Sequence, residues 1–60
     1  MTYKLVLTDP ITKGKMRRSI TADILEIADY WLTMYNRVED EKQIIFAVQL
    51  TFVLMIELEA

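Results

Sequence analysis

The chain has 60 residues, with nine acidic and seven basic side chains and neither cysteine nor histidine. A chain this short forms one domain (1–60) and buries only about 60% of the surface that its unfolded form exposes. Without cysteine no disulfide can form, and without histidine a zinc or iron site would consist of carboxylates alone, which is unusual for those metals. Self-association is the remaining aid to stability for a domain of this size. We therefore predict a homodimer or larger oligomer that holds no cofactor and no metal.

Hydrophobic residues make up 53% of the chain, which is typical of a folded protein. The formal net charge of −2 gives no global attraction towards nucleic acid. The sequence opens on a short alternating run, unlike a secretory signal peptide. Its longest uncharged stretch, residues 43–56, is shorter than the roughly 20 residues that a membrane-spanning helix needs. We expect a soluble cytoplasmic protein without a membrane segment.

The first twenty residues have the pattern of a β-hairpin. Residues 2–8, TYKLVLT, alternate with period two, which predicts a half-buried strand. Residues 9–14, DPITKG, contain the only proline and the only glycine of the chain and therefore have the composition of a turn. Residues 15–20 alternate again, so the sequence predicts two strands joined by a loop of about six residues.

Residues 21–38 have the spacing of an amphipathic helix. Thr21 is placed as its N-cap, and Asp23 lies in the first turn, where a negative charge suits the helix dipole. Leu25 and Leu32 widen the apolar stripe beyond what one small sheet needs, so we expect part of the stripe to meet another chain. The stripe repeats every three or four residues and consists of Ile24, Ile27, Ala28, Trp31, Met34, Tyr35 and Val38.

The last long segment, residues 43–58, is an apolar run with the sequence QIIFAVQLTFVLMIEL. Its β-branched residues favour a strand, although an apolar run of this kind is also compatible with a helix. A single strand of that length is about twice as long as residues 2–8, and a break would have to be a bulge or a bend near residues 47–51. We expect half of the strand to pair within its own chain and half with a second copy about a two-fold axis. The predicted fold class is therefore α+β, a ββαβ unit whose sheet is completed in a homodimer.

Enzymatic chemistry has little support in this composition. The common general base and the common thiol nucleophile are both absent. Asp23, Glu26 and Asp29 follow one another at intervals of three, and residues 39–41 read EDE. We interpret both groups as solvated charges, because the first lies on the polar side of the predicted helix and no spaced oxygen ligands accompany the second. We therefore predict that the protein is not an enzyme.

Two sets of residues remain as candidates for binding. The basic cluster, Lys13, Lys15, Arg17 and Arg18, lies on the predicted hairpin, and a two-stranded ribbon of this kind can enter the major groove of DNA. Aromatic and large apolar residues are favoured at protein interfaces. The candidate interface residues are Tyr30, Leu25, Leu32, Leu50, Phe52, Leu54 and Ile56. The expected function is a small regulatory or accessory module that acts through protein–protein contacts, and the alternative is a nucleic-acid-binding dimer.

The opening heptapeptide MTYKLVL resembles the first strand of the immunoglobulin-binding domains of protein G. The order of a hairpin, a helix near residues 22–37 and a final strand is also similar. The resemblance implies a helix packed on an antiparallel sheet. It transfers no binding residues, because their antibody-contacting helix pattern has no counterpart in this chain.

Overall fold

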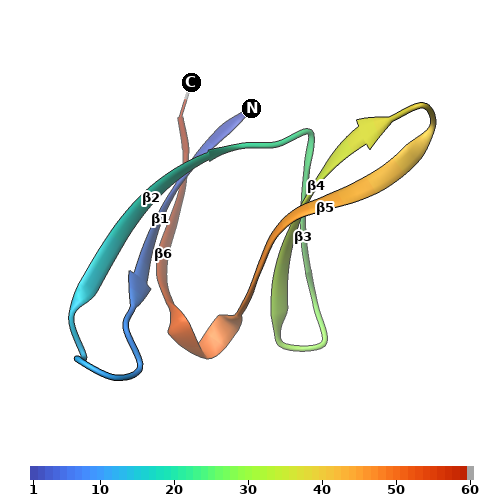
Figure 1. Ribbon diagram of the computed structural model, residues 1–60. Coiled ribbons are helices and arrows are strands. Elements are labelled where there is room, and N and C mark those ends of the chain that lie inside the picture. The colour runs from blue at the N-terminus through green and yellow to red at the C-terminus, as the bar shows by residue number, and fades with distance from the viewer. Residues whose placement is uncertain (60) are drawn as a thin grey trace.

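The computed structural model describes residues 1–59 and consists of two antiparallel three-stranded sheets (Figure 1). Sheet A has the strand order β2-β1-β6, and sheet B has the order β3-β4-β5. The strands are β1 (Thr2–Thr8), β2 (Lys15–Thr21), β3 (Ile24–Ala28), β4 (Trp31–Val38), β5 (Glu41–Gln49) and β6 (Val53–Glu59), with a single 3₁₀ turn, η1 (Leu50–Phe52). The predicted α+β class is wrong, because residues 1–59 form six strands and no α-helix. The layout implied by protein G fails for the same reason.

The predicted N-terminal hairpin is confirmed. β1 and β2 pair in antiparallel register, with Leu5 opposite Arg18 and Thr8 opposite Lys15, and residues 9–14 connect them. β6 pairs with the other edge of β1, so that β1 is the central strand of sheet A. Thr2 lies opposite Glu59, which brings the described chain ends side by side (Figure 1).

The helix predicted over residues 21–38 is a β-hairpin instead. β3 and β4 pair with Ala28 opposite Trp31, and the turn between them is only Asp29 and Tyr30, both of which have positive φ. The spacing of three and four arose because β4 carries large apolar side chains on both faces. Leu32 and Met34 point into the core, while Trp31 and Tyr35 lie on the opposite face.

The single long strand predicted over residues 43–58 is also wrong. The run forms most of β5, then η1, then β6, and these two strands belong to different sheets. The break is fixed by hydrogen bonds. The Leu50 amide donates to the Tyr30 carbonyl at 2.8 Å, and the Val53 amide closes the turn on the Leu50 carbonyl. The tertiary structure therefore places a bend where no glycine or proline marks one.

A second corner joins the two sheets between β2 and β3. Ala22 is buried, and its amide donates to the Met1 carbonyl at 2.9 Å. The Asp23 amide donates to the Tyr35 carbonyl at 3.0 Å, and the Arg37 amide donates to the Asp23 carboxylate at 2.8 Å. One nearly continuous bent strand thus passes from sheet A into sheet B, which is a recurrent way of making the corner of a two-sheet fold.

The core lies between the inner faces of the two sheets. Five residues are buried: Leu5, Leu7, Ala22, Leu32 and Met34. Seven half-buried apolar residues pack around them: Tyr3, Ile20, Leu25, Phe46, Val48, Leu50 and Val53. No charged or polar residue among residues 1–59 is buried. No helix formed by these residues has the length and hydropathy needed to cross a membrane.

Candidate interaction surfaces

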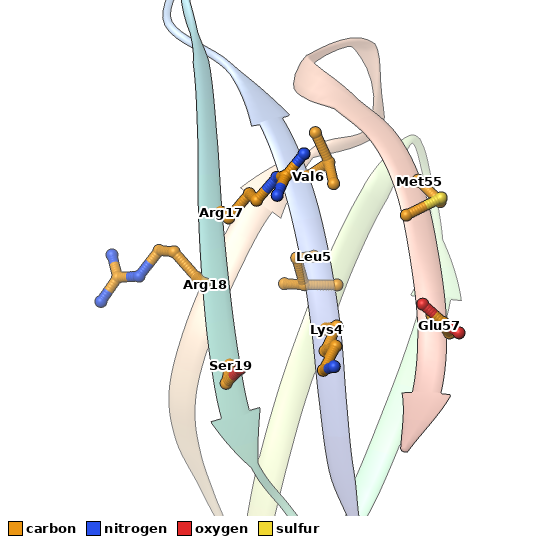
Figure 2. A pocket seen from close by; sticks show the side chains of 8 residues that line it. All are labelled: Lys4, Leu5, Val6, Arg17, Arg18, Ser19, Met55 and Glu57. Carbon is orange, nitrogen blue, oxygen red and sulfur yellow. The ribbon is translucent and has the colours of Figure 1, made fainter.

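The outer face of sheet A is polar and slightly hollowed. The hollow has a volume of about 440 Å³, and Val6 on β1 lies between Arg17 on β2 and Met55 on β6 (Figure 2). Lys4 lies between Ser19 and Glu57 in the next outer row. The Lys4 ammonium also lies 3.7 Å from the Glu59 carboxylate. Because charges of both signs line this face, it has no strong preference for an anionic or a cationic ligand.

The basic cluster does not form a single surface. Arg17 lies on the outer face of sheet A, whereas Arg18 is directed away from β1 and its guanidinium lies 5.4 Å from the centre of the Phe46 ring (Figure 2). Lys15 starts β2, and Lys13 has positive φ in the loop before it. The period-two geometry of a strand separates Arg17 and Arg18, although they are adjacent in the sequence.

The outer face of sheet B has a different character. Trp31, Thr33 and Tyr35 share it, since Leu32 and Met34 point into the core. Trp31 is 43% exposed. Ala28 on β3 lies opposite Trp31, and Ala47 on β5 lies opposite Thr33. We call this surface the aromatic face, and it consists of Ala28, Trp31, Thr33, Tyr35, Ile44 and Ala47.

Charged groups border the aromatic face. Glu26 lies opposite Thr33, midway between Trp31 and Tyr35 along β4. The Lys42 ammonium lies 5.5 Å from the centre of the Tyr35 ring. Sequence reasoning missed this surface, because it placed Trp31 and Tyr35 on the buried stripe of a helix. The signal that identifies it is the period-two pattern of residues 31–35, WLTMY.

The free edge of sheet A at β6 exposes several apolar side chains. Ile56 pairs with the buried Leu5, and Leu58 pairs with Tyr3, so both lie on the core side of the sheet. Both are nevertheless exposed, and Leu58 is 53% exposed. Leu54 is exposed where the register between β1 and β6 shifts. The apolar layer of sheet A therefore continues past the point where sheet B covers it.

The structure distributes the predicted interface residues over several environments. Leu54 and Ile56 lie on the β6 edge, and Tyr30 is 85% exposed in the turn before β4. Leu32 is fully buried and therefore contributes to the core. The other three are half-buried: Leu25, Leu50 and Phe52. The predicted set is not one surface, because it combined residues from the core, a turn and an edge strand.

The predicted acidic groups have separate positions. Asp23 accepts a backbone hydrogen bond at the corner, Glu26 lies beside the aromatic face, and Asp29 belongs to a tight turn. Residues 39–41 lie at the turn between β4 and β5. No three acidic residues within residues 1–59 are grouped closely enough to hold a metal ion.

Asp9 is the carboxylate with the clearest local structure. Its side chain accepts hydrogen bonds from the Ile11 amide at 2.8 Å and from the Thr12 amide at 3.3 Å. These bonds, chiefly the one from Ile11, lower the pKa of Asp9 below its ordinary value of 3.8. Asp9 is only half-buried, so the effect organises the β1–β2 loop and creates no reactive site.

Comparisons of the chain with models of protein families, with curated proteins and with solved structures find no significant match.

Proposed function

We propose that this protein is a small non-enzymatic interaction module that associates with a second copy of itself through the free edge of β6. The observation that carries the proposal is the row of exposed apolar side chains on this edge, which includes Leu54, Ile56 and Leu58. An unpaired strand with such side chains is a template for pairing with another chain. Main-chain hydrogen bonds then supply affinity, and alternating side chains supply specificity.

The other three free edges are better protected against pairing. β2 carries Lys15, Arg17 and Arg18, and charged residues discourage edge-to-edge contact. β3 has only five residues. β5 has an irregular register beside Met34 and begins with Glu41 and Lys42, both features that discourage regular pairing. β6 is therefore the edge on which a second copy is most readily accommodated.

One antiparallel register suits two copies of β6. With Ile56 of one copy opposite Ile56 of the other about a two-fold axis, Leu54 faces Leu58 and Met55 faces Glu57. No two carboxylates are then directly opposite each other, a placement that would destabilise the pair. The two copies of sheet A would form a six-stranded sheet with a continuous apolar layer on its core side. This isologous arrangement closes on itself as a dimer.

Cysteine substitution tests the proposal directly, because the chain contains no cysteine. Across the two-fold axis the Ile56 positions have Cβ atoms about 5 Å apart, close to the spacing that a disulfide spans. We expect Ile56→Cys to form a disulfide-linked dimer under mild oxidation on a non-reducing gel. Leu58→Cys is the matched control, because in this register its two copies lie about 13 Å apart along the strand.

Light scattering provides the independent test on the unmodified chain. We expect the mass to rise above that of the 7.1 kDa monomer as the concentration increases. Leu58→Lys should abolish the rise, because it places a charge opposite Leu54 of the other copy. Met16→Lys adds the same charge to the β2 edge of the same sheet, at a residue that is also exposed, and should leave association unchanged. A wild-type chain that is monomeric at millimolar concentration contradicts the proposal.

Nucleic-acid binding through residues 13–18 has less support, because Arg17 and Arg18 lie on different sides of β2 and Glu57 borders the hollow beside Arg17. Fluorescence anisotropy with duplex DNA across a salt series distinguishes the two functions. Salt-sensitive binding that is lost in Arg17→Ala would favour nucleic acid.

A further inference from the structure

We propose that the aromatic face binds an extended peptide that presents a lysine or arginine over Trp31 and an apolar side chain beside Tyr35. This site belongs to sheet B, whereas the proposed self-association uses the β6 edge of sheet A. The two surfaces are therefore independent. A dimer formed through β6 would carry two such peptide sites.

The first step is the shape of the face. Trp31 and Tyr35 lie on the same strand four residues apart, which corresponds to about 13 Å. Thr33 lies between them, and Ala47 pairs with Thr33 from β5, so the surface between the two rings is low. Ile44 pairs with Tyr35 and is 62% exposed. An extended segment can therefore lie along β4 with one side chain at each ring.

The second step concerns the cations around the two rings. Lys42 already lies over the Tyr35 ring at 5.5 Å, within the range of a cation–π contact. No cation among residues 1–59 lies over Trp31, although the indole is the strongest cation–π partner. Glu26 is a diagonal neighbour of Trp31, at roughly 7–8 Å between Cα atoms. A lysine or arginine of a partner over Trp31 would therefore have both a π face and a counter-ion.

The third step is the charge around the face. At the Tyr35 end, Arg37 pairs with Lys42, so two cations lie beyond the Tyr35 ring. At the Trp31 end, Glu26 is the charged neighbour on β3, and Asp29 lies in the adjoining turn. The face is therefore acidic beside Trp31 and basic beyond Tyr35, and this distribution favours a partner cation over Trp31 and disfavours one over Tyr35.

The test uses Trp31 as the reporter, because it is the only tryptophan in the chain. The probe is an extended peptide that carries one leucine and one lysine four residues apart and has no other charged side chain. A second peptide has glutamate in place of the lysine. We expect the lysine peptide to change Trp31 fluorescence and to bind about tenfold more tightly than the glutamate peptide, the ratio that one cation–π contact provides.

Two isosteric variants distinguish the effect of a counter-ion beside Trp31 from the effect of the net charge of the protein. Glu26→Gln should weaken the lysine peptide severalfold, as the loss of an exposed ion pair does. Glu57→Gln removes a charge that is also exposed, from the outer face of sheet A, and should leave the affinity unchanged. Equal affinity for the two peptides overturns the proposal, as does equal weakening by the two variants.

A titration with oligothymidylate tests single-stranded nucleic acid, which also stacks on exposed aromatic rings. Tighter binding of the oligonucleotide than of the lysine peptide would show that the face is a base-stacking platform and would overturn the proposal. The result is independent of self-association. Failure of Ile56→Cys to cross-link would remove the proposed dimer and leave the Trp31 titration unaffected, and the reverse also holds.

Discussion

Sheet A and sheet B have the same number of strands but differ in what they present to solvent. Along the central strand of sheet A, the outward residues are Thr2, Lys4, Val6 and Thr8, so that β1 alternates between polar and apolar faces. Along β4, the outward residues include Trp31 and Tyr35, so that this central strand is apolar on both faces. A sheet that is covered on one side needs apolar residues on that side only. The exposed aromatic residues of sheet B are therefore not accounted for by packing of the core, whereas the outer face of sheet A has the polar character of a solvated sheet.

The two sheets also differ in the loops that connect their strands. The hairpin of sheet A has a six-residue loop that Asp9 organises through hydrogen bonds. Both hairpins of sheet B have two-residue turns, and all four turn residues have positive φ: Asp29, Tyr30, Glu39 and Asp40. Such turns favour Asn-Gly, because other residues pay a steric cost in the left-handed region. Sheet B therefore contains more local strain than sheet A.

The largest expected effect tests whether the two inner faces are equivalent. A domain of 60 residues has a total stability of about 3–9 kcal/mol. Leu32→Ala in sheet B and Leu5→Ala in sheet A each remove a fully buried side chain and should each destabilise the fold by about 2–5 kcal/mol. Urea denaturation, followed both by Trp31 fluorescence and by far-ultraviolet circular dichroism, measures this effect.

The two signals also test whether the sheets unfold together. Trp31 reports on sheet B alone, and circular dichroism reports on both sheets. Coincident transitions are expected for a single core. A Leu5→Ala variant whose Trp31 transition is unchanged would show that the sheets are independent. Met34→Leu is the control that keeps the volume of a buried side chain, and it should cost less than about 1.5 kcal/mol.

The turns of sheet B provide the next largest effect. Replacing Glu39 and Asp40 by Asn and Gly, respectively, should stabilise the chain by about 1 kcal/mol, because the new residues accept positive φ with little strain. The midpoint of thermal unfolding measures the gain. Glu41→Asn, at the start of β5 where φ is not positive, is the control and should give no gain. A decrease in stability for the double variant would contradict the strain that we assign to this turn.

Sequence patterns predicted sheet A better than sheet B for a physical reason. Residues 2–8 alternate cleanly because one face of β1 is solvated, and Pro10 and Gly14 mark the loop that follows. In residues 24–38 both faces of β4 are apolar, and the turn at residues 29–30 lacks glycine and asparagine. The resulting spacing matches a helix as well as it matches two strands. The apolar residues on both faces of β4 therefore explain why the β3–β4 hairpin was predicted as a helix. They also explain why the aromatic face was not predicted.

The apolar run at residues 43–58 illustrates a second limit. β5 and β6 both have strand composition, as predicted, but η1 separates them without any local signal. The bend follows from the hydrogen bond of Leu50 to Tyr30, a residue twenty positions earlier in the chain. Long-range contacts of this kind are not visible in a single sequence. Leu54 and Ile56 were predicted as interface residues of a single strand over residues 43–58. They are exposed in the structure, but on β6 alone.

A smaller effect sharpens the contrast between the two outer faces. Ile44→Thr on the aromatic face and Val6→Thr on the outer face of sheet A both keep a β-branched side chain. Each should change the free energy of unfolding by no more than about 0.5–1 kcal/mol, because neither residue is fully buried. Only Ile44→Thr should reduce the binding of an apolar dye such as ANS. Equal loss of dye binding in the two variants would show that the outer faces do not differ as we infer.

The smallest effect concerns the loop of sheet A and its dependence on pH. Because the hydrogen bonds from the Ile11 and Thr12 amides lower the pKa of Asp9 below 3.8, the folded chain holds the Asp9 proton less readily than the unfolded chain does. The stabilising contribution is therefore present above pH 3.8 and is lost as the pH falls through the lowered pKa.

Asp9→Asn should remove this part of the acid dependence while it keeps an oxygen that accepts both amides. The difference in unfolding midpoint between neutral pH and a pH below 3.8 should be smaller in Asp9→Asn than in the wild-type chain. Asp40→Asn is the matched control, since it removes one carboxylate from a turn in which that side chain accepts no hydrogen bond from residues 1–59. If both variants flatten the acid dependence equally, net charge explains the effect and the loop hydrogen bonds do not, because of the two carboxylates only that of Asp9 accepts hydrogen bonds from backbone amides of residues 1–59.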